Sequence, residues 1–172
     1  MNKKVKISMI MLMGSLFLTS CGKKETTATD ETTEITETSD EGMQPEAVSN
    51  VLVIEGNDQM QFDKTELRAA AGKPITLTLK HVGKISKEAM GHNLVILQEG
   101  TDEAAFAAKA ITAKDTDYIP ASEKASIVAH TKLLGGGEQD TIEFTVDKKG
   151  TYNFLCTFPG HVAMMKGVLI VE

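Results

Sequence analysis

The sequence predicts an all-β domain, a Greek-key sandwich or small barrel of seven to eight strands with one inserted helix. From Val51 onward, short runs rich in aliphatic and β-branched residues alternate with turn residues. Several runs place apolar side chains at every second position, as in 75–79 and 141–146, which is the period of a strand with one buried face. So many short strands within about 120 residues are typical of a sandwich or barrel. The predicted strands are 51–55, 75–80, 92–97, 126–130, 141–146, 151–156 and 166–171, with a shorter one near 60–62.

One segment departs from this pattern. Residues 102–110 begin with two acids, Asp102 and Glu103, and continue mostly with alanine. Acids in a first turn interact favourably with the helix dipole, and alanine has the highest helix propensity. We therefore expect a helix here, inserted between strands and capped by Thr101.

The composition allows a single domain. The chain has 172 residues, a hydrophobic content of 41%, an aromatic content of 5% and no Trp, so the core must be mainly aliphatic. The net charge of -6 argues against nucleic acid as a partner. Most of this acidity lies in residues 22–49, which carry eight acids and two lysines.

Residues 1–20 are typical of an export signal. Three lysines precede an apolar run, residues 7–18, that is too short to cross a bilayer. The run ends in Leu18-Thr19-Ser20-Cys21, which resembles the bacterial lipobox, whose Cys becomes the lipidated first residue of the mature protein. The alternative is an ordinary secretory signal in which Cys21 is incidental.

Residues 21–49 are then expected to be a lipidated cysteine followed by a tether. Thr, Glu, Ser and Asp dominate this stretch, and it cannot bury enough apolar surface to offset the entropy of ordering. We expect it to be disordered and to let the domain of residues 50–172 search for partners near a membrane.

Cysteine usage points to a metal. The chain has two Cys, so if Cys21 carries lipid, Cys156 is alone, either buried and inert or bound to a metal. Within ten residues, Cys156 is followed by His161 and Met165, and a thiolate, an imidazole and a thioether together suit copper. The blue-copper arrangement of two His and one Cys in a plane with a long axial Met needs one more His. His92, at the start of a predicted strand, is the best candidate.

Each of these residues has an ordinary explanation when taken alone. A single His in a β-domain is usually exposed or hydrogen-bonded, which is our expectation for His81 and His130. Met165 alone would fill the core, and Cys156 alone would be a small buried hydrophobe. The combination of Cys, His and Met around a Pro-Gly pair is not expected from core packing.

The chain resembles the azurins, members of the blue-copper cupredoxin family, over about residues 50–172. The matching segments occur in the same order, and the last two together are the most specific: Glu55–Phe62, Met90–Asn93, Val128–Leu133, Cys156–His161 and Met165–Gly167. The resemblance implies a cupredoxin-like fold and a single copper ion that carries one electron at a time.

The resemblance also implies the role of each ligand. His92 and His161 would supply ring nitrogens, and Cys156 the thiolate. Met165 would be a weak axial sulfur, and the carbonyl of Gly91 a weak axial oxygen opposite it. A side chain at position 91 would crowd a backbone oxygen that approaches the metal.

The residues around the ligands are implied in the same way. In azurins, backbone N–H groups at the positions of Asn93 and Phe158 donate to the thiolate, and the Asn93 side chain ties the two ligand loops together. Such bonds raise the reduction potential. Pro159 has no N–H, which limits the number of donors.

An apolar docking patch is implied around an exposed edge of His161. The alternative is that some of its members are core residues. The patch consists of Met60, Ile85, Met90, Phe158, Pro159 and Met164. His81 matches a buried azurin histidine whose protonation can be linked to redox state, but its neighbours differ here, so we assign it no role.

Two features depart from the azurin pattern. Azurins carry a disulfide remote from the metal, and this chain has no Cys left to form one. Leu94 stands where azurins often have Trp. Neither departure affects the ligand set.

Together these features predict a type 1 copper electron-transfer protein that is not an enzyme, because three strong ligands and a closed axial side leave no open position for a substrate. We expect it to be exported and lipid-anchored to a bacterial membrane through Cys21, facing the periplasm or the cell exterior. Its expected partners are redox proteins such as c-type cytochromes or copper and haem reductases, with neither nucleic acid nor a small-molecule substrate. The alternatives are a copper carrier or storage protein, which would lose copper easily, and an adhesion or structural domain with a relict site.

Overall fold

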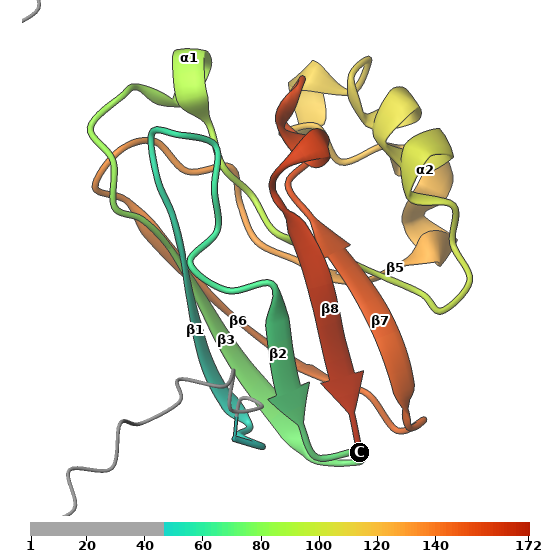
Figure 1. The fold of residues 1–172 in the computed structure, drawn as a ribbon. Helices are drawn as coiled ribbons and strands as arrows, with labels where there is room; N and C mark the ends of the chain where they lie inside the picture. Colours follow the sequence, from blue (N-terminus) through green and yellow to red (C-terminus); the bar gives the residue numbers. More distant parts are fainter. Residues whose placement is uncertain (1–46) are drawn as a thin grey trace, which may run out of the picture. The chain divides into compact units, whose positions relative to one another are not determined.

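The computed structural model describes residues 47–172, which form two β-sheets (Figure 1). The predicted signal, the lipidated cysteine and most of the tether lie outside the described residues. No helix within residues 47–172 is long and apolar enough to cross a membrane. In chain order the elements are β1 (Val51–Gly56), β2 (Glu66–Ala69), β3 (Pro74–His81), α1 (Lys87–Met90), β4 (Val95–Leu97), α2 (Glu103–Ala110), the 3-10 helices η1 (Lys114–Thr116) and η2 (Ala121–Ser126), β5 (Ile127–His130), β6 (Gln139–Thr145), β7 (Gly150–Leu155), the 3-10 helix η3 (His161–Ala163) and β8 (Lys166–Val171).

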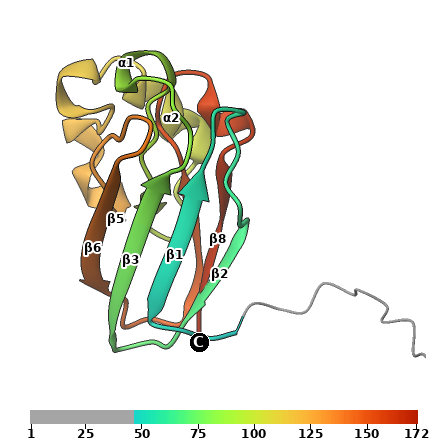
Figure 2. The ribbon, with the colours of Figure 1, turned by 90° about the vertical axis from the view of Figure 1, so that its left-hand side faces the viewer.

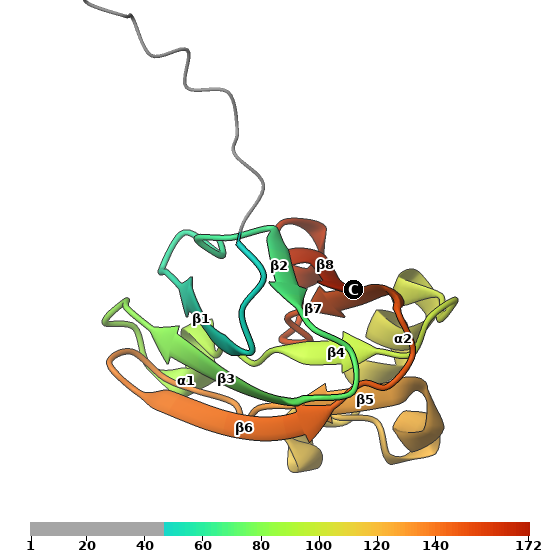
Figure 3. The same ribbon diagram turned by 90° about the horizontal axis from the view of Figure 1, so that it is seen from below.

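The two sheets form a sandwich. One has three strands in the order β1-β3-β6, and the other has five in the order β2-β8-β7-β4-β5. The pairs β1-β3 and β2-β8 are parallel, and all other neighbours are antiparallel. Figure 2 shows β6, β3 and β1 side by side, and Figure 3 shows β4, β7 and β8 across from them. The predicted all-β sandwich with one inserted helix is therefore confirmed.

The main core lies between the sheets. In β3 the side chains of Ile75, Leu77 and Leu79 are fully buried, and they alternate with more exposed residues. Phe154 of the other sheet meets Phe62 edge to face, with ring centroids 5.8 Å apart. Burial of each large apolar side chain contributes roughly 1.5–3 kcal/mol, so this alternation fixes which face of each strand is inside.

Helix α2 covers the outer face of the five-stranded sheet (Figure 1). Its Phe106 is almost fully buried and packs in a second cluster with Val95, Leu97 and Leu155. Strand β4 is therefore covered on both faces, and all three of its residues are buried. This double covering explains why β4 has three consecutive apolar residues instead of an alternating pattern.

The predicted N-cap of this helix is wrong. Asp102, not Thr101, is the N-cap, and its carboxylate accepts a hydrogen bond from the N–H of Ala105 at 3.0 Å. A carboxylate at this position satisfies a free N–H group and also interacts favourably with the helix dipole, which a hydroxyl does less well.

The predicted strand 92–97 begins only at Val95. His92 pairs with Leu134 only as an isolated bridge, so residues 92–94 lie outside the regular ladder of the sheet. The first three residues of the predicted strand are thus part of the site rather than of the sheet.

The short run near 60–62 contributes only an isolated bridge between Phe62 and Gly56. Strand β2, at Glu66–Ala69, was not predicted from the sequence. Its four residues alternate between buried and half-buried, but none of them is β-branched or aromatic, so the sequence carries little strand signal.

Both ligand-bearing segments lie at one end of the sandwich. Residues 91–94 lead from α1 into β4, and residues 156–165 connect β7 to β8. Figure 1 shows α1 and the connection between β7 and β8 at the same end, with the C-terminus at the opposite end.

The Asp58 carboxylate joins two loops at the ligand end. It accepts the N–H of Lys84 at 2.8 Å and the N–H of Ile85 at 3.3 Å. The loop after β1 is thereby tied to the loop after β3. These bonds, above all the one from Lys84, lower the pKa of Asp58 below its usual 3.8.

Replacing Asp58 by Ala should lower the free energy of unfolding at neutral pH, because both acceptors are lost. Since folding lowers the pKa of Asp58, its carboxylate stabilises the fold above pH 3.8, and this contribution disappears as the pH falls through the lower folded-state value. Denaturant unfolding of the wild type and the Asp58→Ala variant should therefore show a difference that shrinks below pH 3.8. A difference that stays constant into this acidic range would contradict the assignment.

Candidate metal centre

His92, Cys156 and His161 converge on one point. Their three donor atoms all lie within 4.8 Å of one another, and all three residues are buried. The Nδ1 atom of His161 is 3.2 Å from Nδ1 of His92 and 3.6 Å from Sγ of Cys156. No other three His, Cys, Asp or Glu side chains in residues 47–172 converge in this way.

This spacing fits one metal ion. Three donors bonded at about 2.0–2.3 Å around an ion lie roughly 3.5–4 Å apart, close to the separations seen here. A thiolate with two imidazoles in one plane is the donor set of blue-copper sites. The residues present therefore fit a single copper ion.

The ring of His92 is held so that Nδ1 faces the centre. Its Nε2 lies 2.8 Å from the carbonyl oxygen of Asn57, an acceptor, so Nε2 carries the proton and donates it. Nδ1 then has a lone pair directed toward Cys156 and His161. A backbone acceptor on the outer nitrogen is the usual way to fix the tautomer of a metal-binding histidine.

Burial sets the protonation of all three ligands. It lowers the pKa of His161 to about 4 and also lowers the pKa of His92, so both rings are neutral at pH 7. It raises the pKa of the Cys156 thiol to about 11, so without a metal this group keeps its proton at neutral pH. Metal binding must therefore displace the thiol proton.

A tight turn brings His161 back beside Cys156. The N–H of His161 donates to the carbonyl of Phe158 at 3.0 Å, and Pro159 and Gly160 occupy the two central positions. Gly160 has φ +85°, which a type II turn requires at its third residue and which glycine adopts without steric cost. The Pro-Gly pair in the sequence thus forms the turn of the ligand loop.

The side chain of Asn93 ties the two ligand segments together. Its Oδ1 accepts the N–H of Thr157 at 2.8 Å, and its Nδ2 donates to Oγ1 of Thr157 at 2.7 Å. Both residues are fully buried or nearly so, which excludes water from these bonds. The position of His92 is therefore coupled to that of Cys156.

Two backbone N–H groups act on the sulfur of Cys156. The N–H groups of Asn93 and Phe158 both lower the pKa of Cys156, in opposition to the larger effect of burial. N–H donors of this kind stabilise negative charge on a thiolate.

Met165, the last residue of the ligand loop, lies near the His92 ring. It is fully buried, and its N–H donates to the carbonyl of His161 at 2.8 Å. Gly56, which the sequence analysis did not single out, allows this packing: a Cβ there would lie 2.9 Å from Cδ2 of His92 and 3.3 Å from Cε of Met165.

Gly91 has no room for a side chain. Its carbonyl oxygen lies 3.9 Å from Sγ of Cys156. A Cβ at this position would lie 2.6 Å from the carbonyl oxygen of Lys87 and 3.0 Å from Cδ2 of Phe158. These neighbours alone exclude a side chain at position 91, and the approach of the Gly91 oxygen to the metal stays a prediction.

His81, to which the sequence assigned no role, is stacked on His92. The ring centroids are 4.1 Å apart and the planes differ by 19°. Nδ1 of His81 accepts the N–H of Gly83, so its Nε2 carries a proton that it donates to the carbonyl of Met90 at 2.8 Å. His81 thus confines the face of the ligand ring. His130 is exposed and lies outside the cluster.

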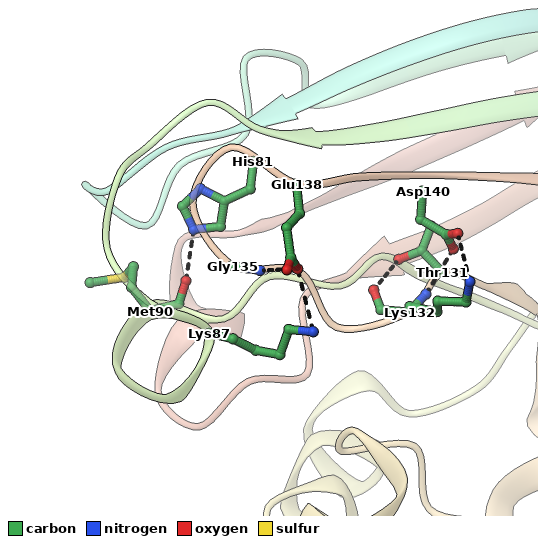
Figure 4. Close-up of polar contacts among 8 residues, drawn as sticks. All are labelled: His81, Lys87, Met90, Thr131, Lys132, Gly135, Glu138 and Asp140. Carbon is green, nitrogen blue, oxygen red and sulfur yellow. Dashed lines mark hydrogen bonds and ion pairs between the residues drawn. The ribbon is translucent and has the colours of Figure 1, made fainter.

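Figure 4 shows how the loop before β6 is held near this histidine. The carboxylate of Glu138 accepts the N–H of Gly135 at 2.8 Å and lies 3.3 Å from Nζ of Lys87. Because Lys87 begins α1, this contact ties α1 to the loop that precedes β6. The carbonyl of Met90 at the end of α1 faces His81 in the same view.

The predicted docking patch is exposed only in part. Ile85 is 39% exposed and Met164 is 54% exposed, and Met60, Met90 and Pro159 are half-buried.

The remaining patch residue, Phe158, is buried, and so is the ligand His161 around which the patch was predicted. Phe158 is 9% exposed and His161 only 2%, so the expected exposed edge of His161 is wrong. The ring of Phe158 packs against His161 with centroids 4.7 Å apart and helps to cover it. Val82, which the sequence analysis missed, is 52% exposed in the same loop as Ile85.

Comparisons with known proteins agree with this geometry. The sequence model of copper binding proteins of the plastocyanin/azurin family matches residues 48–172. Azurin-1 of Alcaligenes xylosoxydans xylosoxydans is 42% identical over 120 residues, which cover 67% of this chain and 92% of that protein. Outer membrane protein H.8 of Neisseria gonorrhoeae is 44% identical over 117 residues, which cover 66% of this chain and 63% of that protein.

A solved structure shows the same fold. The crystal structure of dithionite-reduced auracyanin from the photosynthetic bacterium Roseiflexus castenholzii matches with a TM-score of 0.66 and 39% sequence identity. The match covers 73% of this chain and 99% of that one. This chain therefore belongs to the plastocyanin/azurin family of copper-binding proteins, and the site formed by His92, Cys156 and His161 is that of a blue-copper electron-transfer protein.

Proposed function

We propose that this protein carries single electrons between redox proteins at a bacterial membrane and that it is not an enzyme. The observation that carries the proposal is the buried cluster of His92, Cys156 and His161, whose donor atoms lie within 4.8 Å of one another. A copper ion, when bound, supplies a one-electron couple, Cu(II) and Cu(I).

The protein's own contribution is to hold the ligands in a fixed arrangement. Asn57 fixes one side of the His92 ring and His81 covers one face. Asn93 and Thr157 fix the start of the cysteine loop. Ligands held in this way move little between oxidation states, so the reorganisation energy of electron transfer is low. Burial excludes water and leaves no open position for a substrate, which supports an electron carrier.

We propose two weak axial ligands, from Met165 and Gly91. Met165 would supply a weak axial sulfur and Gly91 a weak axial carbonyl oxygen on the opposite side. Support comes from the burial of Met165 beside the His92 ring and from the Gly91 oxygen 3.9 Å from Sγ of Cys156. Axial ligands of this kind tune the reduction potential without setting the main geometry.

Two substitutions separate the strong ligand from the axial one. Cys156→Ser should abolish the intense visible absorption of the copper-loaded protein, because the thiolate is its source. Met165→Leu should keep the colour and raise the reduction potential, since it removes a donor that favours Cu(II). Visible spectra and voltammetry of both variants measure these effects, with circular dichroism to verify folding. A folded Cys156→Ser protein that remained blue would refute the ligand assignment.

Electron exchange requires a surface close to the metal, and we assign this role to the exposed apolar side chains at the ligand end. Val82, Ile85 and Met164 are each at least 39% exposed, and an apolar surface beside a redox centre favours brief docking of a partner. The partners we propose are redox proteins such as c-type cytochromes or copper and haem reductases.

Introducing a charge into this surface should slow electron exchange. We expect Met164→Lys to lower the second-order rate of electron transfer to a c-type cytochrome by about tenfold, which corresponds to ~1.4 kcal/mol of docking energy. The matched control is Val51→Lys, at the exposed start of β1, which should leave the rate unchanged. Stopped-flow kinetics measure both. Equal rates for the two variants would place docking elsewhere.

We further propose that the protein is exported and anchored by lipid on Cys21, with residues 22–49 as the tether. Support comes from the apolar run that ends at Cys21 and from the acidic, Thr-rich composition that follows it. The relative H.8 is named an outer membrane protein. Acyl chains gain about 0.8 kcal/mol per buried methylene, enough for firm attachment when two or three are present.

Replacing Cys21 by Ser should release the protein from membranes. In bacterial cells that express the full chain, the wild type should sediment with membranes and incorporate labelled fatty acid, because acylation requires the thiol. The Cys21→Ser variant should do neither. Cys156→Ser is the control that should keep both properties. Labelling that survives Cys21→Ser would refute the anchor.

A further inference from the structure

Residues 113–119, between α2 and η2, form a turn that the ligand assignment does not use. Asp117 and Tyr118 have φ values of +55° and +61°, a left-handed conformation that non-glycine residues rarely adopt. The turn is held by hydrogen bonds from the N–H of Tyr118 to the carbonyl of Ala113 at 2.9 Å and from Oγ1 of Thr116 to the carbonyl of Ile119 at 2.7 Å. Strain that persists in a well-bonded turn is often associated with function.

The first contact of this turn is with the residue that couples the ligand segments. The carbonyl oxygen of Asp117 accepts a hydrogen bond from Nδ2 of Asn93 at 3.0 Å. The same Nδ2 also donates to Thr157. The Asn93 amide is therefore oriented from both sides, and its rotation is blocked.

The second contact is with the ring that covers His161. Tyr118 is 8% exposed, and its ring meets Phe158 edge to face, with centroids 5.2 Å apart and planes at 70°. Phe158 in turn lies 4.7 Å from the ring of His161. The Tyr118 ring therefore packs against Phe158, which in turn packs against the ring of the ligand His161.

We propose that Asp117 and Tyr118 are positioning residues that hold Asn93 and Phe158 against Cys156 and so raise the reduction potential of the copper. Asn93 and Phe158 are the two residues whose backbone N–H groups act on the Cys156 sulfur. N–H donors withdraw charge from the thiolate and favour Cu(I), so a looser loop lowers the potential. The inference rests on the proposed copper-binding function.

The test compares the two tyrosines of the chain. Tyr118→Leu removes the aromatic contact with Phe158, and Tyr118→Phe keeps it. Tyr152→Leu is the matched control, because Tyr152 is 3% exposed but lies on β7, where its hydroxyl bonds to the carbonyl of Lys148. We expect Tyr118→Leu to shift the equilibrium with a reference redox couple by about tenfold toward Cu(II), or ~59 mV for one electron. Tyr118→Phe and Tyr152→Leu should keep the wild-type potential.

A second measurement uses the copper-free protein. Cys156 is fully buried, so it should react slowly with a thiol reagent in the wild type. Tyr118→Leu should accelerate this reaction, and Tyr152→Leu should not, even if it lowers the unfolding temperature as much. Cys21 is replaced by Ser in all the proteins compared, so that Cys156 is the only thiol in each.

Several outcomes would overturn the proposal. One is an unchanged potential in a Tyr118→Leu protein that binds copper. Another is an equal shift of the reduction potential in Tyr152→Leu, which would show that the shift reflects a general loss of stability. A wild-type protein that binds no copper at all would refute the proposed function instead, so the two failures are distinguishable.

Discussion

The hydrogen bonds between Asn93 and Thr157 are the contact on which the metal centre depends. The two residues are 64 positions apart, and each follows a ligand directly in the chain. The bonds between Asn93 and Thr157, at 2.7 and 2.8 Å, are the shortest hydrogen bonds between the two ligand segments. A buried amide that lost its partner would also cost about 1–3 kcal/mol, so the arrangement resists distortion. In residues 47–172 no buried side-chain nitrogen or oxygen lacks a hydrogen-bond partner.

Burial explains the remaining properties of the site. The interior stabilises neutral forms, so the imidazoles have free lone pairs at pH 7, whereas the Cys156 thiol, with a pKa of about 11, gives up its proton only to a competing cation. The same burial keeps water away from the donors. A buried site with neutral nitrogen ligands and one thiolate is suited to changing charge by one electron.

The fold and two of the strong ligands, Cys156 and His161, could be predicted because both depend on local sequence patterns, whereas His92 was assigned because the copper arrangement needs a second His and the resemblance to azurins implies it. Strand alternation shows in runs such as Ile75–Leu79, and the spacing of Cys156 and His161 around Pro-Gly contains the turn that joins them. Strand β2 was missed because its residues, Glu-Leu-Arg-Ala, include no β-branched or aromatic side chain that would indicate a strand. The role of Gly56 could not be predicted, since it depends on a side chain from a distant loop packing against it.

Exposure was the least predictable property. His161 was expected to have a free edge, but Phe158 lies over it, and the Tyr118 ring lies against Phe158 in turn. The region that supplies Tyr118 has neither strand nor helix periodicity in its sequence. A left-handed backbone conformation at a residue such as Asp117 lowers stability by roughly 1–2 kcal/mol. The composition of the chain does not show at which positions this conformation occurs.

The most direct measurement of the central claim is a titration of the copper-free protein with Cu(II), followed by visible absorption and electron paramagnetic resonance. The account predicts an intense thiolate-to-copper band that saturates at one ion per chain, with a small copper hyperfine splitting, and that disappears and returns on reduction and reoxidation. A colourless complex, or one that saturates at a different ratio, would show that His92, Cys156 and His161 do not hold the ion together.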